Sequence, residues 1–184
     1  MNQQLIINVL GADQLGILSR ISACVNANQC NILDSRHAIY GQDFSLSMIV
    51  EGSPSAVTKL EILLSSLCLE LDLLSMMKRT SGHHKQNIEQ VVQLAFSGLD
   101  TIGLLNRVCA FLSEREFSIN ALRQKTYRTE DGEAVRCKMV LSTPKSTDLA
   151  KFDEDIKRLM SEMSLSGKIT HTLPQENHEH IESW

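Results

Sequence analysis

The residue pattern best suited to chemistry in this 184-residue chain is a short motif that occurs twice. Gly11-Ala12-Asp13-Gln14-Leu15-Gly16-Ile17-Leu18 returns as Gly98-Leu99-Asp100-Thr101-Ile102-Gly103-Leu104-Leu105. Its glycines permit close backbone approach or a positive φ angle. A helix that begins at the end of this motif would offer unpaired N–H groups and partial positive charge to a carboxylate. The aspartate beside it could hold an ammonium group, so the motif suits a free amino acid.

The same residues also have a purely structural interpretation. Asp13 and Asp100 could be N-caps of the following helices, and the glycines could simply shape a tight turn. A dinucleotide site is a poor alternative, because Gly11-x-Asp13-x-x-Gly16 has an aspartate where pyrophosphate needs close approach of a glycine backbone. The binding and the capping interpretations both stay open at this stage.

Other residue clusters carry less chemistry. His83-His84 and His178-x-His180 lie in polar segments without cysteines or carboxylates at metal-ligand spacing, so we expect solvated histidines. The sequence contains no G-x-S-x-G, H-E-x-x-H or phosphate-loop motif. Arg36 and Arg123 are expected in surface salt bridges. We therefore expect no catalytic residues, no metal site, no cofactor and no enzyme activity.

Composition and charge narrow the class of protein. A net charge of −4 and a pI of about 5.9 argue against a main partner that is nucleic acid, because phosphate binding needs a basic face. The N-terminal residues lack a signal-peptide pattern, and the Leu-rich stretch 60–74 carries acids and is too short for a membrane span. The five cysteines include no Cys-x-x-Cys and are expected to be reduced and mostly buried. These features predict a cytoplasmic protein without membrane or direct nucleic-acid contact.

The motif belongs to an internal repeat. An offset of 87 residues holds without a gap from residue 11 to residue 40, which indicates two copies of one module. The identical pairs in this stretch are Gly11/Gly98, Asp13/Asp100, Gly16/Gly103, Leu18/Leu105, Arg20/Arg107, Ala23/Ala110, Ile32/Ile119, Arg36/Arg123 and Tyr40/Tyr127. After Tyr40 the second copy is longer by four residues, which predicts a longer hairpin turn.

The elements around the motif follow from hydrophobic periodicity. Alternating apolar residues predict a strand before the motif, and Asp13 or Gln14 is expected to begin a helix with Ile17, Leu18, Ile21 and Val25 on its apolar stripe. The pattern then predicts a strand at 31–40, a turn at 41–43 and a strand from 44. Ser53 before Pro54 predicts a capped second helix. The alternation at 69–73 predicts the last strand of the first copy.

The second copy predicts the same order of elements. Its strands are expected at about 88–96 and 168–173, its hairpin at Glu130-Asp131-Gly132, and its second helix is expected to end near Gly167. Each copy is then β-α-β-β-α-β, a ferredoxin-like α+β unit whose antiparallel sheet has both helices on one face. The predicted domains are 1–80 and 88–174, with a linker at 81–87 and a polar tail at 175–184.

Tandem units with this loop resemble ACT domains, small regulatory modules that commonly sense amino acids. A narrower resemblance rests on the segments Leu10-Gly11-Ala12-Asp13, Gly16-Ile17, Cys30-Asn31-Ile32, Asp34-Ser35-Arg36, Glu70-Leu71-Asp72-Leu73-Leu74 and Met77-Lys78-Arg79-Thr80. With these segments the first copy is similar to a tandem-ACT family of transcriptional repressors of the glycine cleavage genes, and the second copy resembles it mainly in architecture and in its loop.

The resemblance implies a function and a set of residues. It implies a repressor that opposes a DNA-bound activator of the LysR type, without contacting DNA itself, and that glycine relieves. ACT domains join through sheet edges, which implies a homo-oligomer, and hold an amino acid with the first loop and the start of the second strand. Carried over by position, the ligand-binding candidates are Asp13, Gly16, Ile17 and Asn31 in the first copy, and Asp100, Gly103, Leu104 and Asn120 in the second.

The chain departs from the ACT pattern at two places. Many ACT loops have proline just before the second glycine, where this chain has Leu15 and Ile102, so the turn must be held in another way. Ser118 aligns with Asn31, and Asn120 follows two positions later, so the second site is expected to be altered or lost. The alternative function is an ACT-type regulatory subunit that docks on an amino-acid metabolic enzyme.

Overall fold

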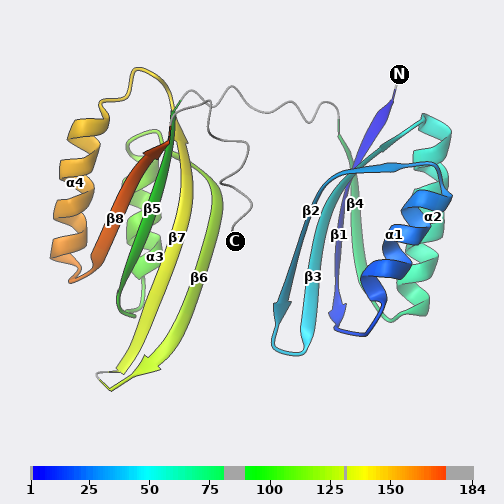
Figure 1. The fold of residues 1–184 in the computed structure, drawn as a ribbon, viewed down its shortest axis with the longest axis horizontal. Coiled ribbons are helices and arrows are strands. Elements are labelled where there is room, and N and C mark those ends of the chain that lie inside the picture. Colours follow the sequence, from blue (N-terminus) through cyan, green and yellow to red (C-terminus); the bar gives the residue numbers. More distant parts are fainter. Residues whose placement is uncertain (1, 81–89, 131, 173–184) are drawn as a thin grey trace. The chain divides into compact units, whose positions relative to one another are not determined.

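The computed structural model describes residues 2–80, 90–130 and 132–172, which divide into two units at residues 84 and 85. Unit 1 contains β1 (Gln3–Ala12), α1 (Ile17–Ala27), β2 (Asn31–Tyr40), β3 (Asp43–Gly52), α2 (Pro54–Glu70) and β4 (Leu74–Thr80). Unit 2 contains β5 (Gln90–Leu99), α3 (Leu104–Ser113), β6 (Ser118–Thr129), β7 (Gly132–Thr143), α4 (Leu149–Glu162) and β8 (Ser166–Thr172). Both units therefore have the predicted order β-α-β-β-α-β (Figure 1). The predicted linker 81–87, the tail 175–184 and both histidine pairs lie outside the described residues.

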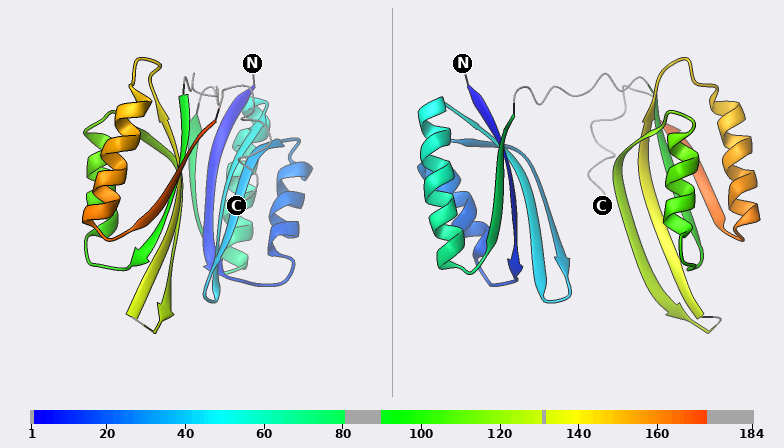
Figure 2. Two further views of the ribbon diagram at one scale, coloured as in Figure 1. Left: turned by 60° about the vertical axis from the view of Figure 1, so that its left-hand side comes forward. Right: turned by 180° about the vertical axis from the view of Figure 1, so that it is seen from behind.

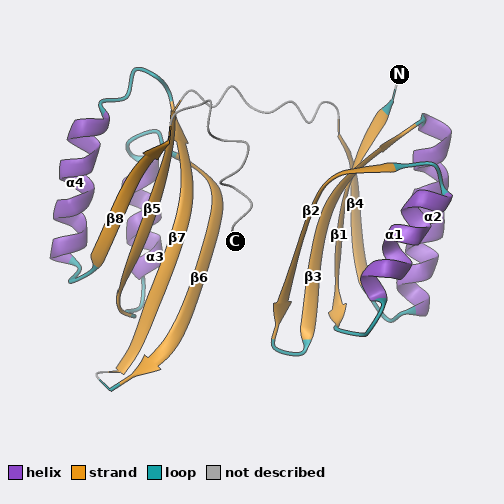
Figure 3. Ribbon diagram, in the orientation of Figure 1, coloured by secondary structure: helices purple, strands orange, loops and turns teal. Residues whose placement is uncertain are grey.

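Each unit is built on one antiparallel four-stranded sheet. The strand order is β2-β3-β1-β4 in unit 1 and β6-β7-β5-β8 in unit 2, so the second strand of each unit forms a free edge. The two helices of each unit cover one face of its sheet (Figures 1, 2 and 3). The opposite face, which neither helix of the unit covers, is called the open face below. The predicted ferredoxin-like α+β architecture is confirmed.

Alternation along the strands decides which side chains enter the core. In β1, the side chains of Leu5, Ile7 and Val9 are buried on the face that the helices cover, because successive side chains of a strand point to opposite faces of the sheet. In α1 the stripe that meets them is Ile17, Ile21 and Val25. Leu18, expected on the same stripe, is instead 46% exposed, because it lies one position away from the buried side of the helix. Unit 2 repeats this arrangement with its own separate core.

Two predicted element ends are wrong for the same reason. The alternation at 69–73 is not a strand: α2 continues to Glu70, and Asp72 leaves the helix with a left-handed φ of 54° before β4 begins at Leu74. In unit 2, α4 ends at Glu162 rather than near Gly167, and Ser164 has a φ of 53°. A non-glycine residue makes both left-handed exits, so no glycine marks the end of the helix.

The extra residues of the second copy lengthen its hairpin strands. β6 and β7 have 12 residues each, whereas β2 and β3 have 10. The predicted longer turn is therefore wrong, because added pairs of residues extend the ladder instead. The hairpin of unit 2 consequently carries more surface along its free edge than the hairpin of unit 1.

The predicted cap of the second helix is confirmed. Ser53 Oγ accepts a hydrogen bond of 3.2 Å from the Ala56 amide, with Pro54 at the first helical position. All five cysteines are free thiols, and burial raises the pKa of Cys137 to about 11. None of the helices that the structure describes has the length and apolar character needed to cross a membrane.

Candidate functional site

The repeated motif adopts the same hydrogen-bonded loop in both units. In unit 1 the Asp13 amide donates to the Gln42 carbonyl over 2.8 Å, which ties the loop to the β2–β3 turn. In unit 2 the Asp100 amide donates to the Glu133 carbonyl, also over 2.8 Å. This bond holds the loop without the proline found in many ACT domains. The two copies thus preserve one loop conformation despite different sequences around it.

The second glycine of the motif begins each helix. Gly16 and Gly103 both have φ 85° and ψ 0°, a left-handed conformation that favours glycine. Neither α1 nor α3 has a side-chain capping bond, so the interpretation of Asp13 and Asp100 as N-caps is wrong. The helices α1 and α3 begin four residues after the aspartate, because the glycine before each helix, and not the aspartate, makes the change of direction. The amides of the first turn are left without a side-chain acceptor.

The loop residues divide into exposed and buried groups. Asp13 is exposed, whereas Asp100 is half-buried and its Oδ2 accepts a 3.1 Å hydrogen bond from Thr126 Oγ1. The side chains of Ile17 and Leu104 are buried in the two cores, and their amides already donate to the carbonyls of Gln14 over 3.2 Å and of Thr101 over 3.1 Å. Leu15 and Ile102 are fully exposed at the tips of the two loops.

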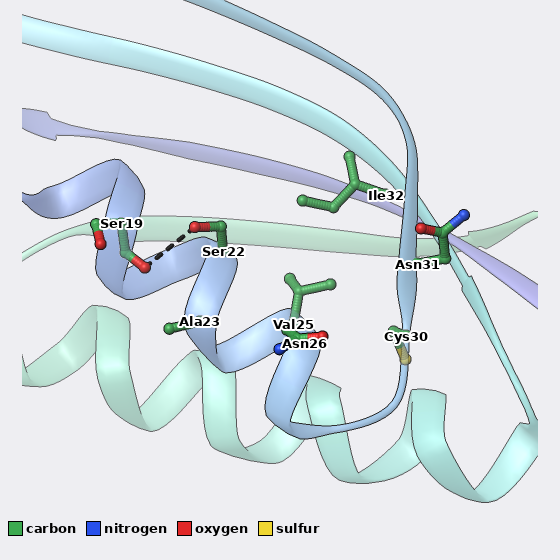
Figure 4. A pocket seen from close by; sticks show the side chains of 8 residues that line it. All are labelled: Ser19, Ser22, Ala23, Val25, Asn26, Cys30, Asn31 and Ile32. Carbon is green, nitrogen blue, oxygen red and sulfur yellow. Dashed lines mark hydrogen bonds between the residues drawn. The ribbon is translucent and has the colours of Figure 1, made fainter.

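A hollow of about 420 Å³ lies between α1 and the start of β2 (Figure 4). It contains the predicted residue Asn31 but none of the predicted loop residues. Its polar lining comes from Ser19, Ser22, Asn26 and Asn31, and Ser22 Oγ donates to the Ser19 carbonyl over 3.1 Å. Cys30 also lines the hollow, and burial raises the pKa of its thiol. The volume is within the usual range for small-molecule sites.

The helical residues of this hollow are absent from the sequence-based prediction. Ser19, Ser22, Ala23 and Asn26 have the spacing i, i+3, i+4 and i+7, which places them on one side of a helix. That stripe of small and polar residues is the signal that could have revealed the hollow.

Among the predicted residues of unit 1, Asn31 lies far from the three in the loop, Asp13, Gly16 and Ile17. The loop lies at the Tyr40 end of β2, because Ala12 pairs with Asp43, whereas Asn31 begins the same strand and pairs with Glu51. A strand of ten residues spans roughly 30 Å. One small amino acid therefore cannot touch Asp13 and Asn31 of the same unit.

The predicted residues of unit 2 are also separated. Asn120 lies beside a β-bulge at the start of β6, and its Oδ1 accepts a 3.1 Å hydrogen bond from Ser142. The loop with Asp100 lies at the other end of that strand.

Phe117 occupies the position of Cys30, and its ring stacks on Phe152 with 4.1 Å between centroids. Unit 2 has thus replaced a small side chain of the hollow with a large one.

Comparisons with known proteins identify the family. Residues 3–78 match the ACT domain model. The chain is 32% identical over 167 residues to the glycine cleavage system transcriptional repressor of Escherichia coli K12, covering 90% of this chain and 88% of that protein. The chain belongs to the glycine cleavage system transcriptional repressor family.

Solved structures agree with this family. The crystal structure of a protein proposed to be a repressor of this family superposes with a TM-score of 0.75 at 28% identity, over 94% of this chain and 99% of that chain. A protein of unknown function from Galdieria sulphuraria superposes with a TM-score of 0.78 at 19% identity, over 94% and 100% of the two chains, which shows the fold alone. The repressor family thus shares the whole two-unit architecture.

The loop geometry leads to a prediction about stability. Asp13→Ala should change the free energy of unfolding by less than about 0.5 kcal/mol, because the side chain is exposed and caps no helix. Gly16→Ala should lower it by about 1 kcal/mol or more, since alanine disfavours a φ of 85°. Urea denaturation measures both, with Gly103→Ala as the matched variant in unit 2. A loss of about 1 kcal/mol in Asp13→Ala would restore the capping role.

Proposed function

We propose that this chain represses transcription of the glycine cleavage system in response to a small amino acid, by binding a DNA-bound activator protein rather than DNA. The observation that carries the proposal is the similarity to a transcriptional repressor over 90% of the chain. The net charge of −4 supports action through a protein partner, because a polyanion repels an acidic chain. The proposed protein is a cytoplasmic regulator without catalytic activity.

The proposed effector is glycine or another small amino acid. Its carboxylate would meet the first turn of α1, whose amides have no side-chain acceptor, and its ammonium group would meet the exposed Asp13. The amide side chain of Asn31 would complete the site with hydrogen bonds. The lining of the hollow contains hydroxyl and amide groups but no charged side chain, so the charged partners must come from the loop.

The separation of Asp13 from Asn31 supports a site shared by two copies of the chain. If the free β2 edges of two copies pair in antiparallel fashion, the loop end of one strand lies beside the Asn31 end of the other. A twofold axis at Ser35 would also place Asp34 of each copy opposite Arg36 of its partner. Such a twofold dimer would contain two copies of the proposed site, each formed by the loop of one chain and Asn31 of the other.

Unit 1 is the proposed binding unit. It has the hollow with Asn31, whereas unit 2 has Ser118 and the bulky Phe117 at the equivalent positions. Asp100 is also engaged by Thr126, while no side-chain hydrogen bond to Asp13 occurs among the described residues. The duplicated loop of unit 2 then has a structural role in holding α3 against its sheet.

Calorimetric titration tests the proposed effector site. The wild-type chain should release or absorb heat with glycine, and Asp13→Ala or Asn31→Ala should weaken binding at least tenfold, because each removes a polar partner of a charged ligand. Asp100→Ala is the matched control and should bind as the wild type does. The absence of heat and of a thermal shift with glycine, serine and other small amino acids would rule out the effector, and full binding by Asp13→Ala would remove that residue from the site.

Sedimentation analysis tests the proposed pairing. The wild-type species should have about twice the 20.6 kDa mass of one chain. Arg36→Asp should weaken the dimer about tenfold, since two acids would then face each other across the β2 pair. Lys59→Asp on the exposed surface of α2 makes the same charge change away from the edge and should leave the dimer intact. A monomeric wild type, or equal dimers in both variants, would contradict the pairing.

Capture from cell extract tests the repressor mechanism. The tagged full-length chain should retain a LysR-type transcription activator, and added glycine should release it. Retention of an amino-acid metabolic enzyme instead would support the alternative of a regulatory subunit. A salt-dependent gel shift with the purified chain alone would show direct DNA binding and overturn the mechanism.

A further inference from the structure

The open face of the unit 2 sheet carries a concentration of positive charge. Side chains that alternate with the buried residues of β5, β6, β7 and β8 point away from the helices. Among the described residues of this face, the charged ones are all cations: Arg123, Lys125, Arg136, Lys138 and Lys168. We name these five residues the basic face.

Strand register brings four of these cations into a compact block. Arg123 lies directly opposite Lys138, and Lys125 lies directly opposite Arg136. Opposite side chains of an antiparallel pair have Cβ atoms about 5 Å apart, and like charges at that distance destabilise the pair. The described ion pairs of the chain include none for Arg123, Lys125 or Arg136. The predicted salt bridge of Arg123 is therefore not found among them. The predicted salt bridge of Arg36 is found, with 3.9 Å between Arg36 Nη2 and Asp34 Oδ2.

The equivalent face of unit 1 is different. Ala38, Ser45 and Ser47 stand at the positions of Lys125, Arg136 and Lys138, and the charges of that face include the acids Asp34 and Glu51. The two units share one backbone arrangement, so the fold does not require the cations. The basic face is a property of unit 2 alone.

The chemistry of the basic face favours an acidic polypeptide over a nucleic acid. Single-stranded nucleic acids bind sheets of this fold by stacking on aromatic residues of the central strands, whereas β5 here presents Gln93, Ala95 and Ser97. The one aromatic side chain among the described residues of this face is Tyr127 on the edge strand β6, and the Arg136 guanidinium lies 5.7 Å from the centre of its ring. A nucleic-acid duplex is bound through many phosphates along its backbone, whereas the four clustered cations here lie on only two neighbouring strands. A net charge of −4 further opposes a long polyanion.

We propose that the basic face binds an acidic, extended segment of the partner protein, which adds to the free edge of β6. From Leu122 to Thr129 this edge is regular, beyond the bulge at Asn120. Arg123 and Lys125 are two residues apart, so a strand with carboxylates at alternate positions matches their spacing. The inference rests on the proposed action through a protein and names the chemistry of the contact.

Fluorescence anisotropy with the full-length chain tests the basic face. The probe is a labelled short peptide in which Glu alternates with Thr, and a peptide of the same composition with all Glu residues grouped is the comparison. The wild type should bind the alternating peptide more tightly, and added salt should weaken the binding. The double variant Lys125→Ala, Arg136→Ser introduces the residues of unit 1 and should weaken binding about tenfold, since two exposed ion pairs contribute about threefold each.

The control variant makes the same change of charge on the helical side of unit 2. Lys151→Ala, Lys157→Ala on α4 should bind the peptide as the wild type does, and circular dichroism should show all variants folded. Equal binding by the wild type and both variants, or no binding of the peptide, would overturn the proposal. Tighter binding of single-stranded or duplex DNA that the basic-face variant loses would overturn it in favour of nucleic acid. Peptide binding can fail while the activator is still captured from extract, so this proposal and the repressor mechanism fail separately.

Discussion

The one-sided core is the constraint on which the rest of each unit depends. Both helices pack on the same face of a four-stranded sheet, so every second side chain in the buried stretches of the central strands β1, β3, β5 and β7 is apolar. The remaining side chains reach the open face and are free to diverge between the copies. The same arrangement leaves β2 and β6 as free edges. Core, open face and edge are thus three consequences of one packing requirement.

The loop after the first strand is the part that duplication has kept most closely. A glycine at φ 85° and an amide bond to the neighbouring hairpin hold it in both units, although the surrounding residues differ. Its conformation serves folding in both copies. Whether the loop also binds an amino acid depends on the polar groups that complete the site. The hollow lined by Asn31 makes unit 1 the better candidate for the binding unit.

The two units divide the proposed work of a regulator. Unit 1 combines an exposed aspartate, a free edge and a hollow of suitable size for a small effector. Unit 2 has exchanged small residues for cations on its open face, where an acidic partner segment would find opposite charge. A duplicated module allows this division because one copy can change its surface while both keep the same core.

The sequence by itself determined the repeat, the order of elements and the loop motif, because hydrophobic periodicity and glycine positions are local features. Alternation alone could not separate the end of α2 from a strand at 69–73, since Asp72 leaves the helix without a glycine. Only tertiary structure decided that Asp13 and Asn31 lie at opposite ends of β2. It also decided that cations from three separate strands form one face, because register between strands sets those distances.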